Sequence, residues 1–311
     1  MRSALLLLPL LLLCQCGEQG DISSEQQQSS AVPVTTELQQ TADFCGMNSY
    51  IHCKALCDMG PRPSGSEAYT RQLHYLSKHL TAAGWSVREE PFKLTNGTKM
   101  VNLHAVMGTD DGTRPIIITC HIDTKIGISP NFVGADDGAS AAAVIIELAR
   151  VLKSHPKAGA VELIFFDGEE AFARNMSRQD GLYGSRYDVA RRQGKLPRYQ
   201  INLDMVGGRN KTIAVPLLDS SPDLLAHYEQ AVAALGYSER RWSIHPGSYL
   251  DDHIPYEEAG VETLNLIADF TNSNWWHTDK DNMSRICPKS LEESGRLVLQ
   301  LLSQLTAENK K

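Results

Sequence analysis

The sequence predicts an α/β fold: a single domain with a mostly parallel central sheet flanked by helices. Short apolar runs, such as residues 116–120 and 161–166, are rich in β-branched and aromatic side chains and end at glycine or polar residues. Such runs are typical of buried strands in a parallel sheet. Segments with apolar residues at helical spacing separate the runs, and this alternation favours a sheet that is covered on both faces.

The expected elements can be taken in chain order. The first is a helix over 67–83, in which Leu73, Leu76 and Leu80 recur at helical spacing before Gly84 ends the pattern. The others are strands at 85–92, 101–107 and 115–120, a helix at 139–152, strands at 161–166 and 200–206, a helix at 223–235, a strand at 263–267 and a closing helix at 289–305.

Acidic residues and histidines stand at the downstream ends of several apolar runs. His121 follows the run at 116–120, and Glu169 follows the run at 161–166. Ligands gather just outside the carboxyl ends of the strands in open α/β sheets. Histidine nitrogens and carboxylate oxygens are the ligands of catalytic zinc, which keeps one position open for water or substrate. The residues expected to meet at this edge are His121, Asp137, Glu169, Glu170, Asp204 and His277.

The adjacent pair Glu169 and Glu170 suggests a division of labour. Successive residues that leave a strand point in different directions, so one carboxylate can bind metal while the other handles protons. A partly desolvated carboxylate beside a metal and a like charge can be tuned towards the operating pH. Taken alone, such a pair is more often a solvated loop edge, but the accompanying histidines and aspartates favour a site.

The composition fits one enzyme-sized domain behind an export signal. The chain has 311 residues, 42% of them hydrophobic, and a net charge of −7, which argues against a nucleic-acid partner. We expect three parts: a signal peptide of lipoprotein type at 1–16, a flexible Gln/Ser-rich linker at 17–41 and a zinc-dependent catalytic domain at 42–311.

The N-terminal apolar stretch at 4–13 is shorter than the ~20 residues needed to span a bilayer, and it is typical of a secretory signal. Cys14 and Cys16 follow it, where a bacterial lipoprotein would be cleaved and acylated, although the preceding Leu13 and Gln15 are not small. We expect an exported protein: a periplasmic or outer-surface lipoprotein anchored at Cys16 or Cys14, or alternatively a secreted one. Membrane contact is expected only through that lipid.

The remaining cysteines do not follow a recognised zinc spacing. Because helical cysteines four residues apart in exported proteins more often pack or pair elsewhere, we hypothesise a disulfide among Cys45, Cys53 and Cys57. Cys120, inside an apolar strand, is expected to be a buried free thiol.

Several motifs are similar to those of the zinc aminopeptidase family M28, over roughly residues 50–305. They are His121-x-Asp123, Gly134-x-x-Asp137, Glu169-Glu170, Asp204 and His277, with Gly60-Pro61-Arg62-Pro63-Ser64-Gly65-Ser66 ahead of the first helix. Five stretches in order resemble the glutaminyl-peptide cyclotransferases, or glutaminyl cyclases, more closely. They are residues 120–125, 165–172, 182–186, 251–256 and 276–278.

The cyclase resemblance implies conversion of the N-terminal glutamine of peptides or proteins to pyroglutamate with release of ammonia. It implies one zinc ion, held by Asp137, Glu170 and His277, and a proton-shuttling Glu169. The matching positions further imply that Asp204 and Asp251 flank the proton path, that Trp276 walls the substrate pocket, and that Asp252 and His253 belong to the pocket as support for the loop of Asp251.

Two other functions stay open. In a two-metal M28 aminopeptidase, His121 and Asp204 would complete a second zinc site, Asp137 would bridge the two metals, and Glu169 would deprotonate a bound water. A binding protein that kept the fold and lost catalysis would usually lack a ligand or the glutamate, and none is missing. We therefore favour the cyclase, whose oligomeric state the sequence leaves open.

The sequence also departs from the animal cyclases. Residues 173–176 occupy the loop where those enzymes carry a tryptophan after the glutamate pair, and no cysteine lies within 141–143 to pair with the one before the first histidine. These departures concern the pocket wall and the disulfides rather than the metal ligands.

Overall fold

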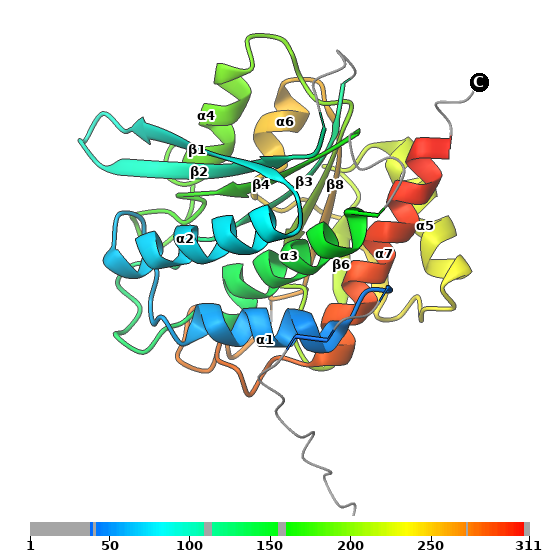
Figure 1. Ribbon diagram of the computed structural model, residues 1–311, viewed down its shortest axis with the longest axis horizontal. Coiled ribbons are helices and arrows are strands. Elements are labelled where there is room, and N and C mark those ends of the chain that lie inside the picture. The colour runs from blue at the N-terminus through cyan, green and yellow to red at the C-terminus, as the bar shows by residue number, and fades with distance from the viewer. Residues whose placement is uncertain (1–37, 40–41, 109–113, 155–159, 272, 308–311) are drawn as a thin grey trace, which may run out of the picture. The chain divides into compact units, whose positions relative to one another are not determined.

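A six-stranded sheet forms the centre of the fold, with its strands in the order β1-β2-β4-β3-β5-β8 (Figure 1). The structure is a computed structural model that describes residues 38–39, 42–108, 114–154, 160–271 and 273–307. The strands are β1 (Ser86–Lys93), β2 (Lys99–Val106), β3 (Ile116–His121), β4 (Val161–Phe166), β5 (Tyr199–Asp204) and β8 (Glu262–Ile267). Because β4, β3, β5 and β8 run parallel and only β2 runs antiparallel to its neighbours β1 and β4, the predicted fold class is confirmed.

Helices cover both faces of this sheet. Figure 1 shows α4 (Tyr183–Arg191) and α6 (Ile254–Glu258) on one face, and α2 (Glu67–Ala82) and α3 (Ala141–Leu152) on the other. The closing helix α7 (Pro288–Ala307) packs against α3. Every residue of β3, β4 and β5 is buried, as expected of strands that are covered on two sides.

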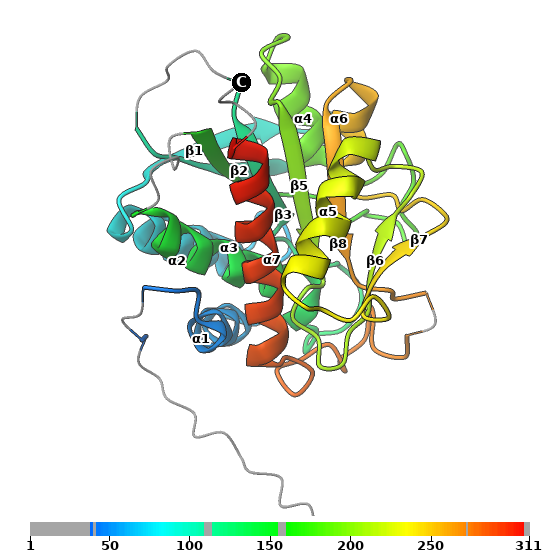
Figure 2. The ribbon, with the colours of Figure 1, turned by 90° about the vertical axis from the view of Figure 1, so that its right-hand side faces the viewer.

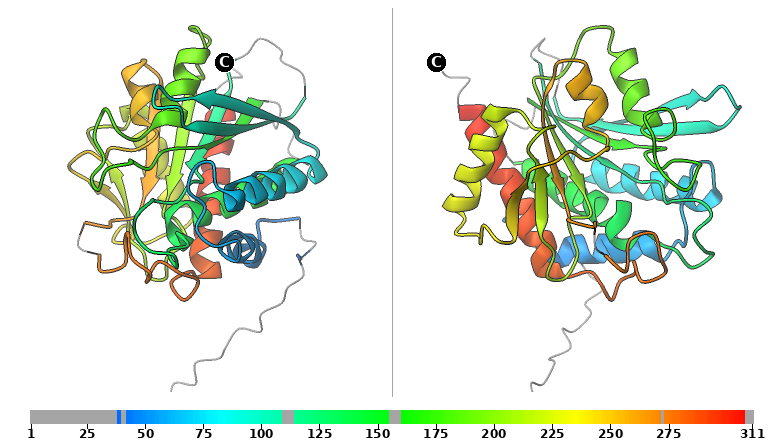
Figure 3. Two further views of the ribbon diagram at one scale, coloured as in Figure 1. Left: turned by 90° about the vertical axis from the view of Figure 1, so that its left-hand side faces the viewer. Right: turned by 180° about the vertical axis from the view of Figure 1, so that it is seen from behind.

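The remaining elements lie outside these two layers. Helix α1 (Gly46–Cys57) packs on α3 and α7, and α5 (Pro222–Ala234) packs on α7 and β8 (Figure 2). A parallel pair of short strands, β6 (Ile213–Pro216) and β7 (Trp242–His245), adjoins β8. The views from the left and from behind in Figure 3 show the same arrangement.

The topology places a crevice at the carboxyl ends of the central strands. After β3, the chain crosses through α3 to β4 on one side, and then through α4 to β5 on the other side of β3. The loops that follow β3 and β5 therefore diverge at a switch point in the strand order, which is where α/β sheets bind ligands.

The N-terminal predictions fall mostly outside the described residues. The signal peptide at 1–16, with Cys14 and Cys16, lies entirely outside them, and so does the linker at 17–41 except for Leu38 and Gln39. The Gln39 N–H donates to Asn48 Oδ1 at 2.7 Å, so the chain already contacts α1 there. Among the described residues, no helix combines the length and apolar character needed to cross a membrane.

The predicted disulfide among Cys45, Cys53 and Cys57 is wrong. All five cysteines within the described residues are free thiols. Cys53 and Cys57 are one turn apart on the same face of α1 and project side by side into the core, where the Cys53 thiol donates to the Ala135 carbonyl at 3.3 Å. Cys120 is a buried free thiol, as predicted.

Candidate active site

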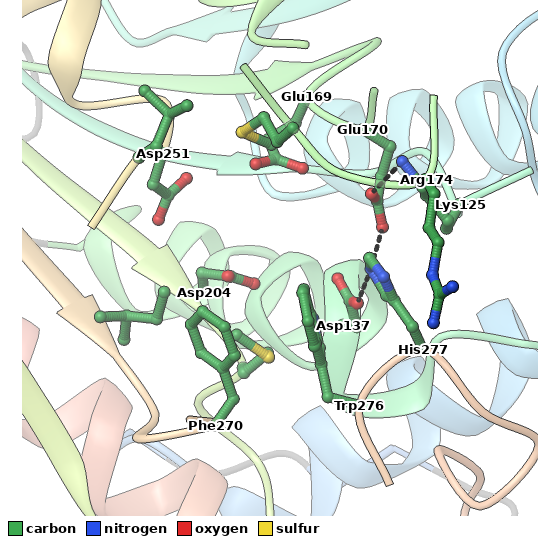
Figure 4. A pocket seen from close by; sticks show the side chains of 14 residues that line it. Lys125, Asp137, Glu169, Glu170, Arg174, Asp204, Asp251, Phe270, Trp276 and His277 are labelled. Atoms are coloured by element: carbon green, nitrogen blue, oxygen red, sulfur yellow. Dashed lines mark hydrogen bonds and ion pairs between the residues drawn. The ribbon is translucent and has the colours of Figure 1, made fainter. Parts of the chain in front are cut away.

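The carboxyl edge of the sheet opens into a cavity of about 200 Å³ (Figure 4). Its floor consists of buried residues and its rim of half-buried and exposed ones. The floor is lined by Lys125, Asp137, Glu169, Glu170, Asp204, Met205, Asp251 and Ile267, and the rim by Arg174, Met176, Leu250, Phe270, Trp276 and His277.

One set of possible metal ligands consists of Asp137, Glu170 and His277. Nε2 of His277 lies 3.0 Å from Glu170 Oε1 and 3.4 Å from Asp137 Oδ2. In Figure 4, the dashed lines join Lys125, Glu170, His277 and Asp137 in series. One nitrogen and two carboxylates, with the cavity beside them, match the three protein ligands and open position of a catalytic zinc site.

A second set shares Asp137 with the first. Nε2 of His121 lies 3.2 Å from Asp137 Oδ1 and 3.3 Å from Asp204 Oδ1. The two carboxylate oxygens of Asp137 therefore face different histidines, His121 on one side and His277 on the other. A carboxylate placed in this way can bridge two metal ions.

The residues present fit a bound cation. Asp137 Oδ2 is buried and makes no hydrogen bond, although a buried polar atom is costly without a partner. The floor gathers five carboxylates and has Lys125 as its basic side chain other than histidine. Oxygen and imidazole donors of this kind suit zinc.

A local break in the helix geometry aims Asp137 at the cavity. The chain is kinked at Ala135–Ser140 before α3 starts, and Asp137 has non-helical torsions of φ −80° and ψ 93°. Both oxygens of Asp281 accept hydrogen bonds from this turn, from the Asp136 N–H at 2.8 Å and the Asp137 N–H at 3.1 Å. Asp281 thus holds the backbone that carries the shared ligand.

Asp123 plays the same part for the glutamate pair. Its two oxygens accept hydrogen bonds from the Glu169 N–H at 3.1 Å and the Glu170 N–H at 3.2 Å. Gly168, at φ 74°, makes the turn in which β4 ends, a torsion at which a side chain would be strained. Asp123 also takes part in holding His121, since its carbonyl oxygen lies 3.2 Å from His121 Nδ1.

His277 is held by stacking rather than by regular structure. Its backbone has a positive φ of 51°, which is uncommon for a residue other than glycine and frequent at functional sites. The Trp276 ring stacks on it with ring centroids 3.9 Å apart, and Phe270 packs against Trp276 at 4.7 Å. Trp276 lies in the pocket wall, where it was predicted.

Asp251 lines the floor and is fixed by two amides. Its Oδ2 accepts hydrogen bonds from Asn202 Nδ2 at 3.0 Å and Asn265 Nδ2 at 2.9 Å. Asp252 and His253 were predicted to belong to the pocket, but this is wrong, because both are fully buried behind Asp251 and do not line the cavity. Asp252 accepts a hydrogen bond from Ser185 Oγ at 2.5 Å, so these residues support the loop, as the sequence also suggested.

Comparison with known proteins shows which family combines this fold and these residues. The model of peptidase family M28 matches residues 102–302. The chain belongs to peptidase family M28. Among its M28 relatives, it is 31% identical to the glutaminyl-peptide cyclotransferase of Gloydius blomhoffii over 285 residues, which cover 78% of this chain and 76% of that protein.

Solved structures with the same fold support this assignment. The glutaminyl cyclase of Porphyromonas gingivalis superposes with a TM-score of 0.76 at 26% identity and covers 84% of this chain and 99% of that one. A Zn-dependent exopeptidase of Parabacteroides distasonis shares the fold with a TM-score of 0.74 at 24% identity, covering 83% and 98%. The predicted place in the glutaminyl-peptide cyclotransferase branch of M28 is therefore confirmed.

Burial strongly shifts the pKa values of the titratable side chains in this pocket. It raises the pKa of Glu169 well above its usual range, and repulsion from Glu170 and Asp251 adds to this rise against the attraction of His121. Burial also raises the pKa of Asp204 to about 8 despite its hydrogen bond with His121. For His277, burial lowers the pKa, but the contacts with Asp137 and Glu170 outweigh it and raise the pKa to about 10.

Sequence reasoning missed four parts of this pocket. Lys125 lies 3.6 Å from Glu170 Oε2 and donates to the Ala171 carbonyl, which fixes a ligand of the first set. Arg174 and Phe270 belong to the rim, and Asp281 holds the turn of Asp137. Lys125 ends the stretch 120–125 and Arg174 lies in the loop 173–176, so both stand in segments that the sequence singled out without giving these two residues a role, whereas Phe270 and Asp281 carry no local signal.

Proposed function

We propose that the protein is a zinc-dependent glutaminyl-peptide cyclotransferase that acts on the N-terminal glutamine of peptides and proteins. The observation that carries the proposal is the placement of Glu169 on the floor of a cavity of about 200 Å³, beside the ligand set Asp137, Glu170 and His277. The cyclotransferase of Gloydius blomhoffii and the glutaminyl cyclase of Porphyromonas gingivalis align with most of this chain, which supports the same activity.

The pocket geometry suits attack within one substrate molecule. The α-amine of the terminal glutamine attacks its own γ-carboxamide carbon, a five-membered lactam forms, and the C–N bond to the amide nitrogen breaks. Asp137, Glu170 and His277 would hold a zinc ion, which would supply polarisation of the γ-carboxamide oxygen. Because both reacting groups belong to one residue, the walls need only orient it and keep water away.

Glu169 is the residue that moves protons. It takes one proton from the attacking amine and passes it to the departing amide nitrogen, so that ammonia leaves and no net proton is consumed. Asp123 fixes its backbone, and Asp204 and Asp251 line the same floor. Trp276 and Phe270 cover the substrate from the open side and limit access of water.

A second candidate is an aminopeptidase with two metal ions. The observation that favours it is the second ligand set, His121, Asp137 and Asp204, whose ligand atoms lie within 4.8 Å of one another. With Asp137 shared between the sets, Glu169 would serve as a general base towards water. We propose one zinc ion for the cyclase and two only for this alternative.

The deciding experiment incubates purified, zinc-loaded protein with one glutamine-initiated and one leucine-initiated peptide and follows both by mass spectrometry. Loss of ammonia from the glutamine peptide alone, absent in Glu169→Gln, supports the cyclase. Loss of an N-terminal residue from either peptide would assign an aminopeptidase instead. No change in either peptide would favour a binding protein.

We further propose that the protein is exported by residues 1–16 and anchored as a periplasmic or outer-surface lipoprotein at Cys16 or Cys14, with plain secretion as the alternative. Mass spectrometry of the membrane-extracted N-terminal peptide tests this. A diacylglyceryl mass on either cysteine supports anchoring, and an unmodified mature N-terminus in the soluble fraction supports secretion.

A further inference from the structure

Arg174 is a charged residue of the pocket that the proposed reaction does not use. It lies in the loop after the glutamate pair, and Figure 4 shows it on the side of Glu170 and His277, across the cavity from Asp251. Its neighbour Arg178 is paired with Glu258 on the surface. The Arg174 guanidinium has no ion pair within the part of the chain that the structure describes.

The acidic side chains of the pocket lie deeper than Arg174. All five carboxylates that line it are buried in the floor. The rim is exposed or half-buried, and apart from His277, which belongs to the candidate ligand set, Arg174 is the charged side chain among its described residues, while Met176, Leu250, Phe270 and Trp276 are apolar or aromatic. A ligand that enters thus meets one fixed positive charge at the mouth.

The backbone just before Arg174 is fixed. The two oxygens of Asp180 accept hydrogen bonds from the Phe172 N–H and the Ala173 N–H, both at 2.8 Å. Tyr183 Oη also donates to Asp180 at 2.8 Å. Because these donors occupy Asp180, the nearest acidic residue of the loop is engaged with the backbone and a phenol. Arg174 therefore stays available to a ligand.

The size of the cavity determines which part of a peptide reaches the rim. At about 200 Å³ it is smaller than the ~300–1,000 Å³ of most small-molecule sites, so it is suited to the terminal residue alone. The following residue must pass the rim. We infer that Arg174 binds a carboxylate on the residue that follows the terminal glutamine, which makes acidic second positions the preferred substrate class. This inference rests on the proposed function.

Three tripeptide amides test the preference on the zinc-loaded enzyme: Gln-Glu-Ala-amide, Gln-Gln-Ala-amide and Gln-Lys-Ala-amide. We expect kcat/KM to be about fivefold higher for the glutamate peptide than for the glutamine peptide, the upper end for a solvent-exposed ion pair, and lowest for the lysine peptide. The difference between the peptides should appear in KM rather than in kcat, because Arg174 would contact the second residue equally in the bound substrate and in the transition state. Raising the salt to about 0.5 M should shrink it.

Substitutions at Arg174 separate charge from shape. Arg174→Gln should bring the ratio of kcat/KM between the glutamate and glutamine peptides to about one, Arg174→Glu should invert the preference, and Arg174→Lys should keep it. Arg178→Gln is the matched control from the same loop, and it should keep the ratio because Arg178 pairs with Glu258 rather than lining the pocket.

The carboxylate could also be the C-terminus of a dipeptide. Gln-Ala with a free C-terminus and Gln-Ala-amide distinguish this source, and a preference for the free acid that Arg174→Gln removes supports the inference as well. If the wild-type enzyme cyclises all the peptides but Arg174→Gln changes neither ratio, the inference is overturned and the proposed function stands. If no glutamine peptide is cyclised, the proposed function itself fails.

Discussion

Two buried clusters of carboxylates and histidines lie at opposite ends of β4, and each has the spacing to hold a metal ion. One is the pocket cluster around Asp137, after the carboxyl end of the strand. The other, which we call the hairpin cluster, joins β1, β2, β4 and α4. Its members are Glu90, His104, Glu162, Asp188, Arg191 and Arg192.

The two clusters differ in where their positive charge comes from. In the hairpin cluster, Arg192 lies 2.9 Å from Glu162 and 2.5 Å from Asp188, and Arg191 lies 2.6 Å from Glu90, so the chain neutralises its own carboxylates. The pocket floor has five carboxylates but no arginine. The comparison teaches that ligand spacing alone does not indicate a metal site, and that a deficit of internal cations does.

Removing the shared ligand should have the largest effect. We expect Asp137→Asn to lower kcat/KM by more than the ~10–100-fold seen for outer partners of metal ligands, because the carboxylate faces both histidines. The zinc content, measured by mass spectrometry of the dialysed protein, should fall with it. Asp188→Asn in the hairpin cluster is the control and should keep its zinc. Equal zinc loss in both variants would erase the distinction between the clusters.

Breaking the hairpin cluster should cost stability rather than activity. In Glu162→Gln, the partners His104 at 2.8 Å and Arg192 at 2.9 Å lose a buried counter-charge, and the free energy of unfolding should drop by about 3–5 kcal/mol. Urea denaturation measures this drop, and kcat per folded molecule should hold. Asp58→Asn, in the exposed pair with Lys54, should cost less than about 1 kcal/mol.

Loosening the support of Asp137 should have an intermediate effect. Asp281→Asn leaves one acceptor oxygen for two backbone N–H groups, so we expect a loss of zinc affinity or activity of about 10–100-fold, measured by competition with a chelator. The exposed Asp279, two residues earlier, provides the control Asp279→Asn. An unchanged chelator titration in Asp281→Asn would show that the turn holds its shape unaided.

The smallest expected effect is a pH dependence of stability. Burial lowers the pKa of His104, but hydrogen bonds with Glu162 and Glu90 outweigh it, and the folded-state pKa is raised. The stabilisation is then complete below the unfolded pKa of ~6.5 and is lost as the pH rises through the raised folded value. In the wild type, the free energy of unfolding should therefore fall above pH ~6.5 by at most about 1.4 kcal/mol per pH unit because of His104, and His104→Asn should remove this contribution. Parallel pH profiles of wild type and variant would contradict this.

The sequence predicted the sheet because buried strands leave local patterns, and its candidate ligands also lie in local motifs. Fully buried strands such as β3 and β4 appear as apolar runs, and Glu170 closely follows β4, whereas Asp137 and His277 lie further along their loops and were predicted from motifs. The short elements α4, α6, β6 and β7 were missed, since helices of nine and five residues and strands of four give too little periodicity. Helix α1 was missed because its buried side includes Asn48, Ser49 and His52.

The parts of the site that sequence could not give are long-range contacts. Asp281 meets the turn of Asp137 across 144 residues, and Asp251 meets Asn202 across 49. Asp252 and His253 follow Asp251 in a motif but are buried behind it. A motif shows which residues belong together, whereas the direction of each side chain depends on the packing of the folded chain.

The candidate ligands Asp137, Glu170 and His277 stand on three different loops, after β3, β4 and β8, and Arg174 lies further along the same loop as Glu170, between β4 and α4. A change of length or charge in the part of this loop beyond Glu170 leaves the end of β4 and Glu170 where they are. Under the function that we propose, residues close to the strand ends carry out the reaction and the distal part of the loop selects the substrate, so that new peptide preferences can arise without altering the chemistry.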